Sequence, residues 1–264
     1  MGLESLCTAM TAIPPPLRAW SKHLENRCAP DEIPAYWKTH DVLTFLADTG
    51  MYDASLYQGL DSAEKEQVLH FKSDYFKKRF AVSRSILRLI LHHIPGTENN
   101  ADIILNKQKN GRIRVNTRQD IFISLSYSGS CIAVTVGKRK IGSDIERVCV
   151  VNIMKTRSSP LFENLKSGNG ESRNQHLLHV WTLLEAYAKF HDMSLYPLVK
   201  DRFFLPDAHF VSYCIDQRSI LSLASDSRPM KDTLLWIDPG TFSSGVKNTI
   251  CPSSIFGGDT YVRA

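Results

Sequence analysis

The sequence predicts a mixed α/β fold of the α+β kind, in which long amphipathic helices pack on small antiparallel sheets. Three patterns lead to this expectation: a helical stretch at 61–94, short β-rich runs between turn residues at 103–145, and a second long helix at about 174–190 with further strands after it. The chain has 264 residues, of which 43% are hydrophobic, so it can bury a sizeable core as one large or two small domains.

The first forty residues are expected to be an N-terminal extension. The triple proline at 14–16, together with Pro30 and Pro34, interrupts any helix that could start there. A first strand is expected at 41–45.

Two helical segments are then expected between 61 and 94. The apolar face of the second holds Phe76, Phe80, Leu87, Leu91 and Ile94. Its basic residues, Lys77, Lys78, Arg84 and Arg88, fall mostly off that face. One face of this helix should therefore pack, and the other should be basic.

The region after this helix reads as a sheet built from hairpins. Strands are expected at 103–105, 113–115, 121–125, 132–136 and 141–145, with turns at Asn110-Gly111, Ser128-Gly129 and Gly137. A polar loop at 167–170 precedes the second long helix, whose apolar stripe is Leu177, Trp181, Leu184 and Ala188. Further strands are expected at 203–205, 209–215, 219–224 and 234–237, followed by a loose tail at 241–264.

The composition limits the classes of partner. A net charge of +5, from 32 basic and 27 acidic residues, suits an anionic ligand or an acidic partner. We find no helix-turn-helix, aromatic RNA motif or zinc-finger spacing, so nucleic acid is not expected. The six cysteines are scattered without paired spacing, and no apolar run reaches the ~20 residues of a membrane helix. We therefore expect a cytoplasmic protein with reduced thiols and no membrane contact.

Three carboxylates are candidates for chemistry. Asp144 and Glu146 are two residues apart in an expected strand, so they share a face with backbone positions about 6.6 Å apart, and one Mg²⁺ could take both. Glu185 and Lys189 are four residues apart on the second long helix and also share a face. Each pair alone could equally be ordinary: two acids at a solvated strand end, and a surface ion pair.

The order of these fragments resembles the Sfp-type 4′-phosphopantetheinyl transferase family, over about residues 60–240. The matching pieces are Arg79-Phe-Ala-Val-Ser-Arg-Ser-Ile-Leu-Arg88, Lys109-Asn-Gly-Arg112, Ile123-Ser-Leu-Ser-Tyr-Ser-Gly129, Ile141-Gly-Ser-Asp-Ile-Glu146 and Trp181-Thr-Leu-Leu-Glu-Ala-Tyr-Ala-Lys189. The resemblance implies a pseudo-dimer of two similar halves, here 41–120 and 121–240, each a long helix on a small antiparallel sheet.

The resemblance also implies roles for individual residues. Those implied to bind Mg²⁺ beside the pyrophosphate of coenzyme A are Asp144, Glu146 and Glu185. Lys189 would stabilise phosphate charge, and Glu185 could also accept the proton of the attacking serine. Those implied to lie against the nucleotide and its phosphates are Arg79, Arg112, Ser126 and Tyr127.

The implied activity is Mg²⁺-dependent transfer of 4′-phosphopantetheine from coenzyme A to a serine of an apo acyl or peptidyl carrier protein. We expect a monomer whose basic helical face docks the acidic helix of the carrier. Two positions depart from the family pattern: Tyr127 stands where histidine is usual, and Leu184 where lysine is usual. The alternative is a catalytically silent relative that binds carrier protein or coenzyme A.

Overall fold

A computed structural model gives the structure of this protein. It describes residues 17–20, 27–52, 59–97, 103–108, 112–116, 118, 120–147, 170–200, 208–226 and 230–237. In these residues the fold is mixed α/β, with helices and several small sheets, as the sequence predicts.

Most of the strands lie in two four-stranded sheets. One has the order β1-β8-β9-β7, formed by Leu17–Trp20, Ala208–Ile215, Ser219–Asp226 and Ile141–Arg147. The other has the order β10-β2-β6-β5, formed by Asp232–Trp236, Val42–Asp48, Cys131–Gly137 and Phe122–Ser128. A small hairpin pairs β3 (Leu105–Lys107) with β4 (Ile113–Val115).

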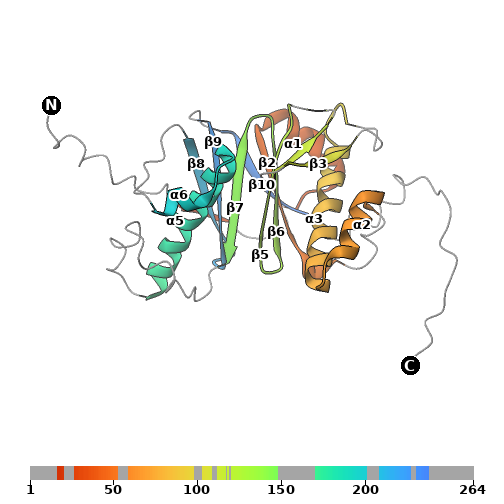
Figure 1. The fold of residues 1–264 in the computed structure, drawn as a ribbon. Coiled ribbons are helices and arrows are strands. Elements are labelled where there is room, and N and C mark those ends of the chain that lie inside the picture. The colour runs from red at the N-terminus through yellow and green to blue at the C-terminus, as the bar shows by residue number, and fades with distance from the viewer. Residues whose placement is uncertain are drawn as a thin grey trace, which may run out of the picture.

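The helices cover the outer faces of the two sheets. Those near the second sheet are α1 (Ile33–Thr39), α2 (Ser62–His70) and α3 (Asp74–His92), and those near the first are α5 (Gly170–His191) and α6 (Leu195–Lys200). Figure 1 shows α5 and α6 on one side, the strands in the middle, and α1, α2 and α3 on the other side. The layers are therefore helix, sheet, sheet and helix.

The alternation of side chains along the strands produces this layering. Along β2, Leu43 and Phe45 point to the α3 side and pack with Ile86 and Ile90. Val42 and Leu46 point the other way and pack with residues of β7, β8 and β9. Because successive side chains of a strand point to opposite faces, a strand buried on both sides must be apolar at nearly every position.

The capping of α2 explains where that helix begins. The Asp61 side chain accepts a hydrogen bond from the Glu64 backbone N–H at 2.8 Å, and the Glu64 side chain accepts one from the Asp61 backbone N–H at 3.2 Å. This reciprocal pair satisfies two N–H groups that the helix itself cannot. The two helices expected between 61 and 94 are thus confirmed as α2 and α3.

The expectation that prolines exclude a helix from the first forty residues is wrong. Pro34 lies in the first turn of α1, where its missing N–H interrupts no helical hydrogen bond. Ile33 and Trp37 are buried against the core, and Cys28 is buried beside them. Within the same region β1 adds a parallel strand to the edge of β8.

The sheets do not divide the chain at residue 120. Strands β5 and β6, which we expected to open a second half, belong to the α3-covered sheet: β6 pairs with β2, and β5 pairs with β6. Strand β10 joins the same sheet by parallel pairing with β2. The predicted loop at 167–169, strand at 203–205 and tail at 241–264 lie outside the described residues. Among the described helices, none is both long enough and apolar enough to cross a membrane.

Candidate active site

Three serines of β5 join the two sheets. Ser124, Ser126 and Ser128 alternate along the strand, so their side chains share one face. Their Oγ atoms accept hydrogen bonds from the backbone N–H groups of Ser143, Ile145 and Arg147 in β7, at 2.9, 3.1 and 2.7 Å. This serine ladder runs in the same direction along both strands, so β5 and β7 lie parallel, joined by hydroxyls instead of backbone pairs.

The same hydroxyls hold two of the predicted carboxylates. Ser126 donates to Asp144 Oδ1 at 2.7 Å, and Ser128 donates to Glu146 Oε2 at 2.8 Å. Asp144 and Glu146 therefore do share a face of β7, as the spacing predicts. The Asp144 side chain is only 3% exposed, and its second oxygen, Oδ2, is buried with no hydrogen-bond partner among the described residues.

A glycine lets α5 approach β7 closely enough to complete the cluster. A Cβ on Gly142 would lie 2.0 Å from the Ala186 carbonyl oxygen and 2.5 Å from the Phe190 nitrogen, both backbone atoms of α5. Helix and strand are thus in direct backbone contact at this point. The contact brings Glu185 and Lys189 of α5 beside Asp144.

Lys189 connects the helix to the carboxylates. Its Nζ donates to Asp144 Oδ1 at 2.6 Å and to the Ser143 carbonyl at 3.1 Å, and lies 3.9 Å from Glu185 Oε2. The sequence alone allowed a simple surface pair between Glu185 and Lys189. The structure instead makes Lys189 the cation of a partly buried acidic cluster.

The crowding of carboxylates perturbs their protonation. Burial, followed by the charge of Asp144, raises the pKa of Glu185 to about 7. Burial also raises the pKa of Glu146, with the Ser128 hydrogen bond opposing the shift and Asp144 adding to it. Both directions follow from placing several negative charges in a poorly solvated place. The cluster would gain stability from a further cation.

A cavity of roughly 730 Å³ opens beside this cluster. Among the predicted site residues, Arg79, Arg112, Tyr127, Glu185 and Lys189 line it. The remaining three, Asp144, Glu146 and Ser126, are not among its lining residues and connect to it through Lys189 and Glu185. Further cations of the wall are Arg84 and Lys107, and its apolar part includes Phe71, Phe76 and Phe80.

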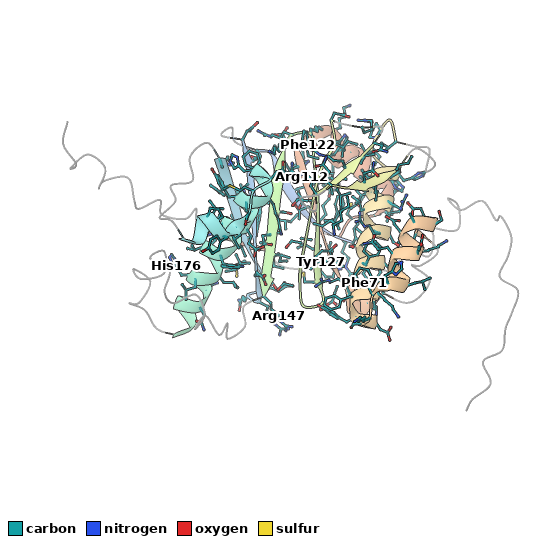
Figure 2. All side chains as sticks on the ribbon, in the orientation of Figure 1. Phe71, Arg112, Phe122, Tyr127, Arg147 and His176 are labelled. Atoms are coloured by element: carbon teal, nitrogen blue, oxygen red, sulfur yellow. The ribbon has the colours of Figure 1, made fainter. Side chains whose placement is uncertain are left out.

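Arg79 is held against aromatic rings. Its guanidinium carbon lies 4.6 Å from the ring centre of Tyr127, 5.0 Å from that of Phe76 and 5.5 Å from that of Tyr75. The Tyr127 hydroxyl donates to Ser83 Oγ at 3.0 Å. Tyr127 therefore presents its ring to Arg79 while its hydroxyl is turned to α3. Figure 2 shows Tyr127 between the central strands and α3.

Arg112 has structural partners in addition to its place in the cavity wall. Its Nε lies 2.9 Å from Asp192 Oδ1, and its Nη2 donates to the Lys189 carbonyl at 2.5 Å. Asp192 has a φ of +61° just after α5, the left-handed conformation common at helix ends. Arg112, labelled in Figure 2, thus secures the end of the helix that carries Lys189. The resemblance implied only a phosphate contact at this position.

The expected basic face of α3 is smaller than the sequence suggests. Arg84 is buried, and Arg88 donates to Glu64 Oε2 at 2.8 Å and also pairs with Asp61. Lys77 pairs with Asp74 at 3.1 Å. The helical pattern placed Arg84 and Arg88 off the apolar stripe but could not show that α2 covers them. The basic face expected to dock a carrier therefore does not include Arg84, and its Arg88 and Lys77 are already paired with acidic side chains.

The long helix α5 follows its predicted stripe with one exception. Leu177, Leu184 and Ala188 are buried, whereas Trp181 is partly exposed. Leu184 packs with Tyr187, Ala188 and Leu198. Its side chain belongs to the core between α5 and α6, so this position has a packing role.

The described residues contain no group of three or more His, Cys, Asp or Glu side chains already arranged to hold a metal ion. The donor chemistry nevertheless fits Mg²⁺, which prefers carboxylate oxygens. Within the described part of the chain, Asp144 Oδ2 is buried with no hydrogen-bond partner, and the pKa of the neighbouring Glu185 is raised. One oxygen of Asp144 is engaged by Lys189 and Ser126. A metal site here remains a prediction.

Sequence reasoning missed three structural contributions to the site: the close approach at Gly142, the link that the β5 serines make to β7, and the burial of Arg84 in the cavity wall. Gly142 could have been suspected, because a glycine inside a strand often marks a close backbone approach. The alternation of Ser124, Ser126 and Ser128 was visible, but nothing in it indicated a second sheet. Arg84 was assigned to the wrong surface.

Comparison of the chain with protein-family models and with curated proteins returned no match.

Proposed function

We propose that this protein transfers the 4′-phosphopantetheine arm of coenzyme A to a serine of an apo acyl or peptidyl carrier protein, with Mg²⁺ and with release of 3′,5′-ADP. One observation carries the proposal: Asp144, Glu146, Glu185 and Lys189 converge beside a cavity with several cations in its wall. Phosphoryl transfer needs mainly charge neutralisation and in-line positioning, and this set of residues suits both.

The proposal extends to the architecture. The helix–sheet pairs α3 with β10-β2-β6-β5 and α5 with β1-β8-β9-β7 would be the two counterparts of a pseudo-dimer. The serine ladder would then join the counterparts, and the cavity between α3 and the end of α5 would hold coenzyme A. A volume of roughly 730 Å³ lies within the usual range for cofactor-sized ligands.

The residues of the cluster have distinct roles in this proposal. Asp144, Glu146 and Glu185 would hold Mg²⁺, which would neutralise negative charge on the pyrophosphate when bound. Lys189 Nζ would move from Asp144 toward a phosphate oxygen. The carrier serine oxygen forms a bond to the β-phosphorus of coenzyme A, and the bond from that phosphorus to the oxygen that leaves with 3′,5′-ADP breaks.

Glu185 would take the proton of the attacking serine. Burial and Asp144 raise the pKa of Glu185 to about 7 in the metal-free protein, and a bound Mg²⁺ would favour the ionised form, which is the form that accepts a proton. Its side chain is 26% exposed and lines the cavity, so an incoming hydroxyl can reach it. Lys189, 3.9 Å away, favours the ionised form that accepts the proton.

A second candidate function is binding without transfer. Two contacts favour it: the Tyr127 hydroxyl is already engaged by Ser83, and Lys189 is already engaged by Asp144. A protein in this state would keep coenzyme A or a carrier bound without reacting. The departure from the family pattern at Tyr127 agrees with either candidate.

Mass spectrometry of several apo-carrier proteins separates the candidates. Each carrier is incubated with this protein, coenzyme A and Mg²⁺, and a gain of one phosphopantetheine on a serine is the expected result. Asp144→Ala serves as the matched negative control, because it removes one of the carboxylates that converge on the cluster. Binding of coenzyme A without any mass gain on any carrier would favour the silent protein.

A further inference from the structure

Arg84 lies in the cavity wall with its charge poorly compensated. It projects from α3, lines the cavity, and has a side chain that is only 8% exposed. A guanidinium does not lose its proton in proteins, so when buried it needs acceptors for its N–H groups. Burial is also the main cause that lowers the pKa of Arg84.

The protein supplies few acceptors to this side chain. Arg84 Nε lies 3.8 Å from Glu64 Oε1, beyond hydrogen-bonding distance, and both atoms are buried without a hydrogen-bond partner in the described structure. The ring of Phe80 lies against the guanidinium, with its centre 5.1 Å from the guanidinium carbon. A ring face is a weak substitute for an anion.

Arg88, one turn further along α3, shows what a satisfied arginine looks like here. Its Nε donates to Glu64 Oε2 at 2.8 Å, its Nη1 donates to the Ile103 carbonyl at 3.0 Å, and its Nη2 pairs with Asp61. Glu64 is thus committed to Arg88 and only weakly to Arg84. In contrast to Arg88, Arg84 has room for a hydrogen-bond acceptor supplied by a ligand in the cavity.

We propose that Arg84 is an anion-binding residue of this cavity and contacts a phosphate group of its ligand. The guanidinium presents paired N–H donors that match two phosphate oxygens, and a buried charge-assisted contact is stronger than an exposed one. Arg79 lies on the same wall and is held in place by the Tyr127 ring. Two guanidiniums on one wall favour a ligand with at least one doubly charged phosphate.

This inference deepens the proposed function and relies on it only for the choice of nucleotide. Calorimetric titration would compare 3′,5′-ADP with adenosine, using the full chain. We expect the wild type to bind 3′,5′-ADP more tightly, and Arg84→Gln to weaken that binding about 10- to 100-fold while leaving adenosine unchanged. Lys65→Gln on the exposed side of α2 removes the same charge away from the cavity, and should bind like the wild type.

A thermal melt in phosphate-free buffer separates an effect of Arg84→Gln on ligand binding from an effect on folding. Because Arg84 is buried beside Arg88, its removal should leave the melting temperature unchanged or raise it, and inorganic pyrophosphate should stabilise the wild type but not Arg84→Gln. If Arg84→Gln instead melts much lower and pyrophosphate stabilises both equally, Arg84 is only a partner of Glu64 and the inference is wrong.

The remaining outcomes separate this inference from the proposed function. Binding of pyrophosphate that depends on Arg84, without binding of 3′,5′-ADP, would support the anion site and count against coenzyme A as the ligand. A wild-type protein that binds neither pyrophosphate nor 3′,5′-ADP would overturn the inference.

Discussion

Replacing Gly142 with alanine tests the close contact that assembles the candidate site. The new Cβ would lie 2.0 Å from the Ala186 carbonyl oxygen, whereas ordinary contact begins at 3.4 Å, so α5 and β7 must separate by about 1.4 Å. Both obstructing atoms belong to helix backbone, so no side-chain rotation can relieve the clash. We expect a loss of about 3 kcal/mol in the free energy of unfolding, measured by urea denaturation.

The same separation should disrupt the cluster. Lys189 lies 2.6 Å from Asp144, and a displacement of more than 1 Å at this point breaks that hydrogen bond. If the proposed transfer is correct, its rate should fall about 100-fold, as expected for misplacement by about 1 Å. Gly50→Ala is the matched control, because its Cβ would meet only the tip of the Asp48 side chain at 3.2 Å. A Gly142→Ala protein with wild-type stability would refute the backbone contact between α5 and β7.

Three further predictions follow from the site. The pKa of Glu185 is raised from 4.5 to about 7, so its ionisation opposes folding. In metal-free buffer, the stability of the wild type relative to Glu185→Gln should fall as the pH rises from about 4.5 to 7, and should stay level above that. The total fall should be up to about 3 kcal/mol. A pH-independent difference in urea unfolding would contradict this. Leu184→Lys buries a charge among Tyr187 and its neighbours, and should lower the melting temperature sharply; an unchanged melt would show that Leu184 is not core. Arg112→Ala removes the donor to a helix-end carbonyl and one of the cations beside Asp192, which keeps Lys140 at 3.2 Å. The loss in urea unfolding should be about 1–3 kcal/mol, whereas a loss below about 0.5 kcal/mol would show that Arg112 does not secure α5.

Local patterns in the sequence predicted the elements of the fold well. The short β-rich runs between turn residues located β5, β6, β7, β8 and β9, and the helical periodicity located α3 and α5. The pattern could not assign strands to sheets. Whether β5 pairs with β6 or with β7 depends on contacts between segments far apart in the sequence, and such contacts produce no periodic pattern.

Residue spacing predicted the two local pairs of the candidate site, but not how the pairs meet. Two-residue spacing placed Asp144 and Glu146 on one strand face, and four-residue spacing placed Glu185 with Lys189, as the structure shows. The meeting of the two pairs is a tertiary contact, and only the resemblance pointed to it. Arg84 shows the opposite case: a charge at a helical position that looks exposed can be buried when a neighbouring helix lies across it.

The serine ladder changes how relatives of this protein should be compared. Each of its hydroxyls bridges the sheets by accepting a hydrogen bond from a β7 N–H, and those of Ser126 and Ser128 also donate to a carboxylate and orient it. Selection for a stable fold alone would retain these serines in a lineage that had lost its activity. Their persistence in a relative would therefore say little about catalysis, whereas loss of Glu185 or Lys189, which the fold does not require for joining its sheets, would be informative.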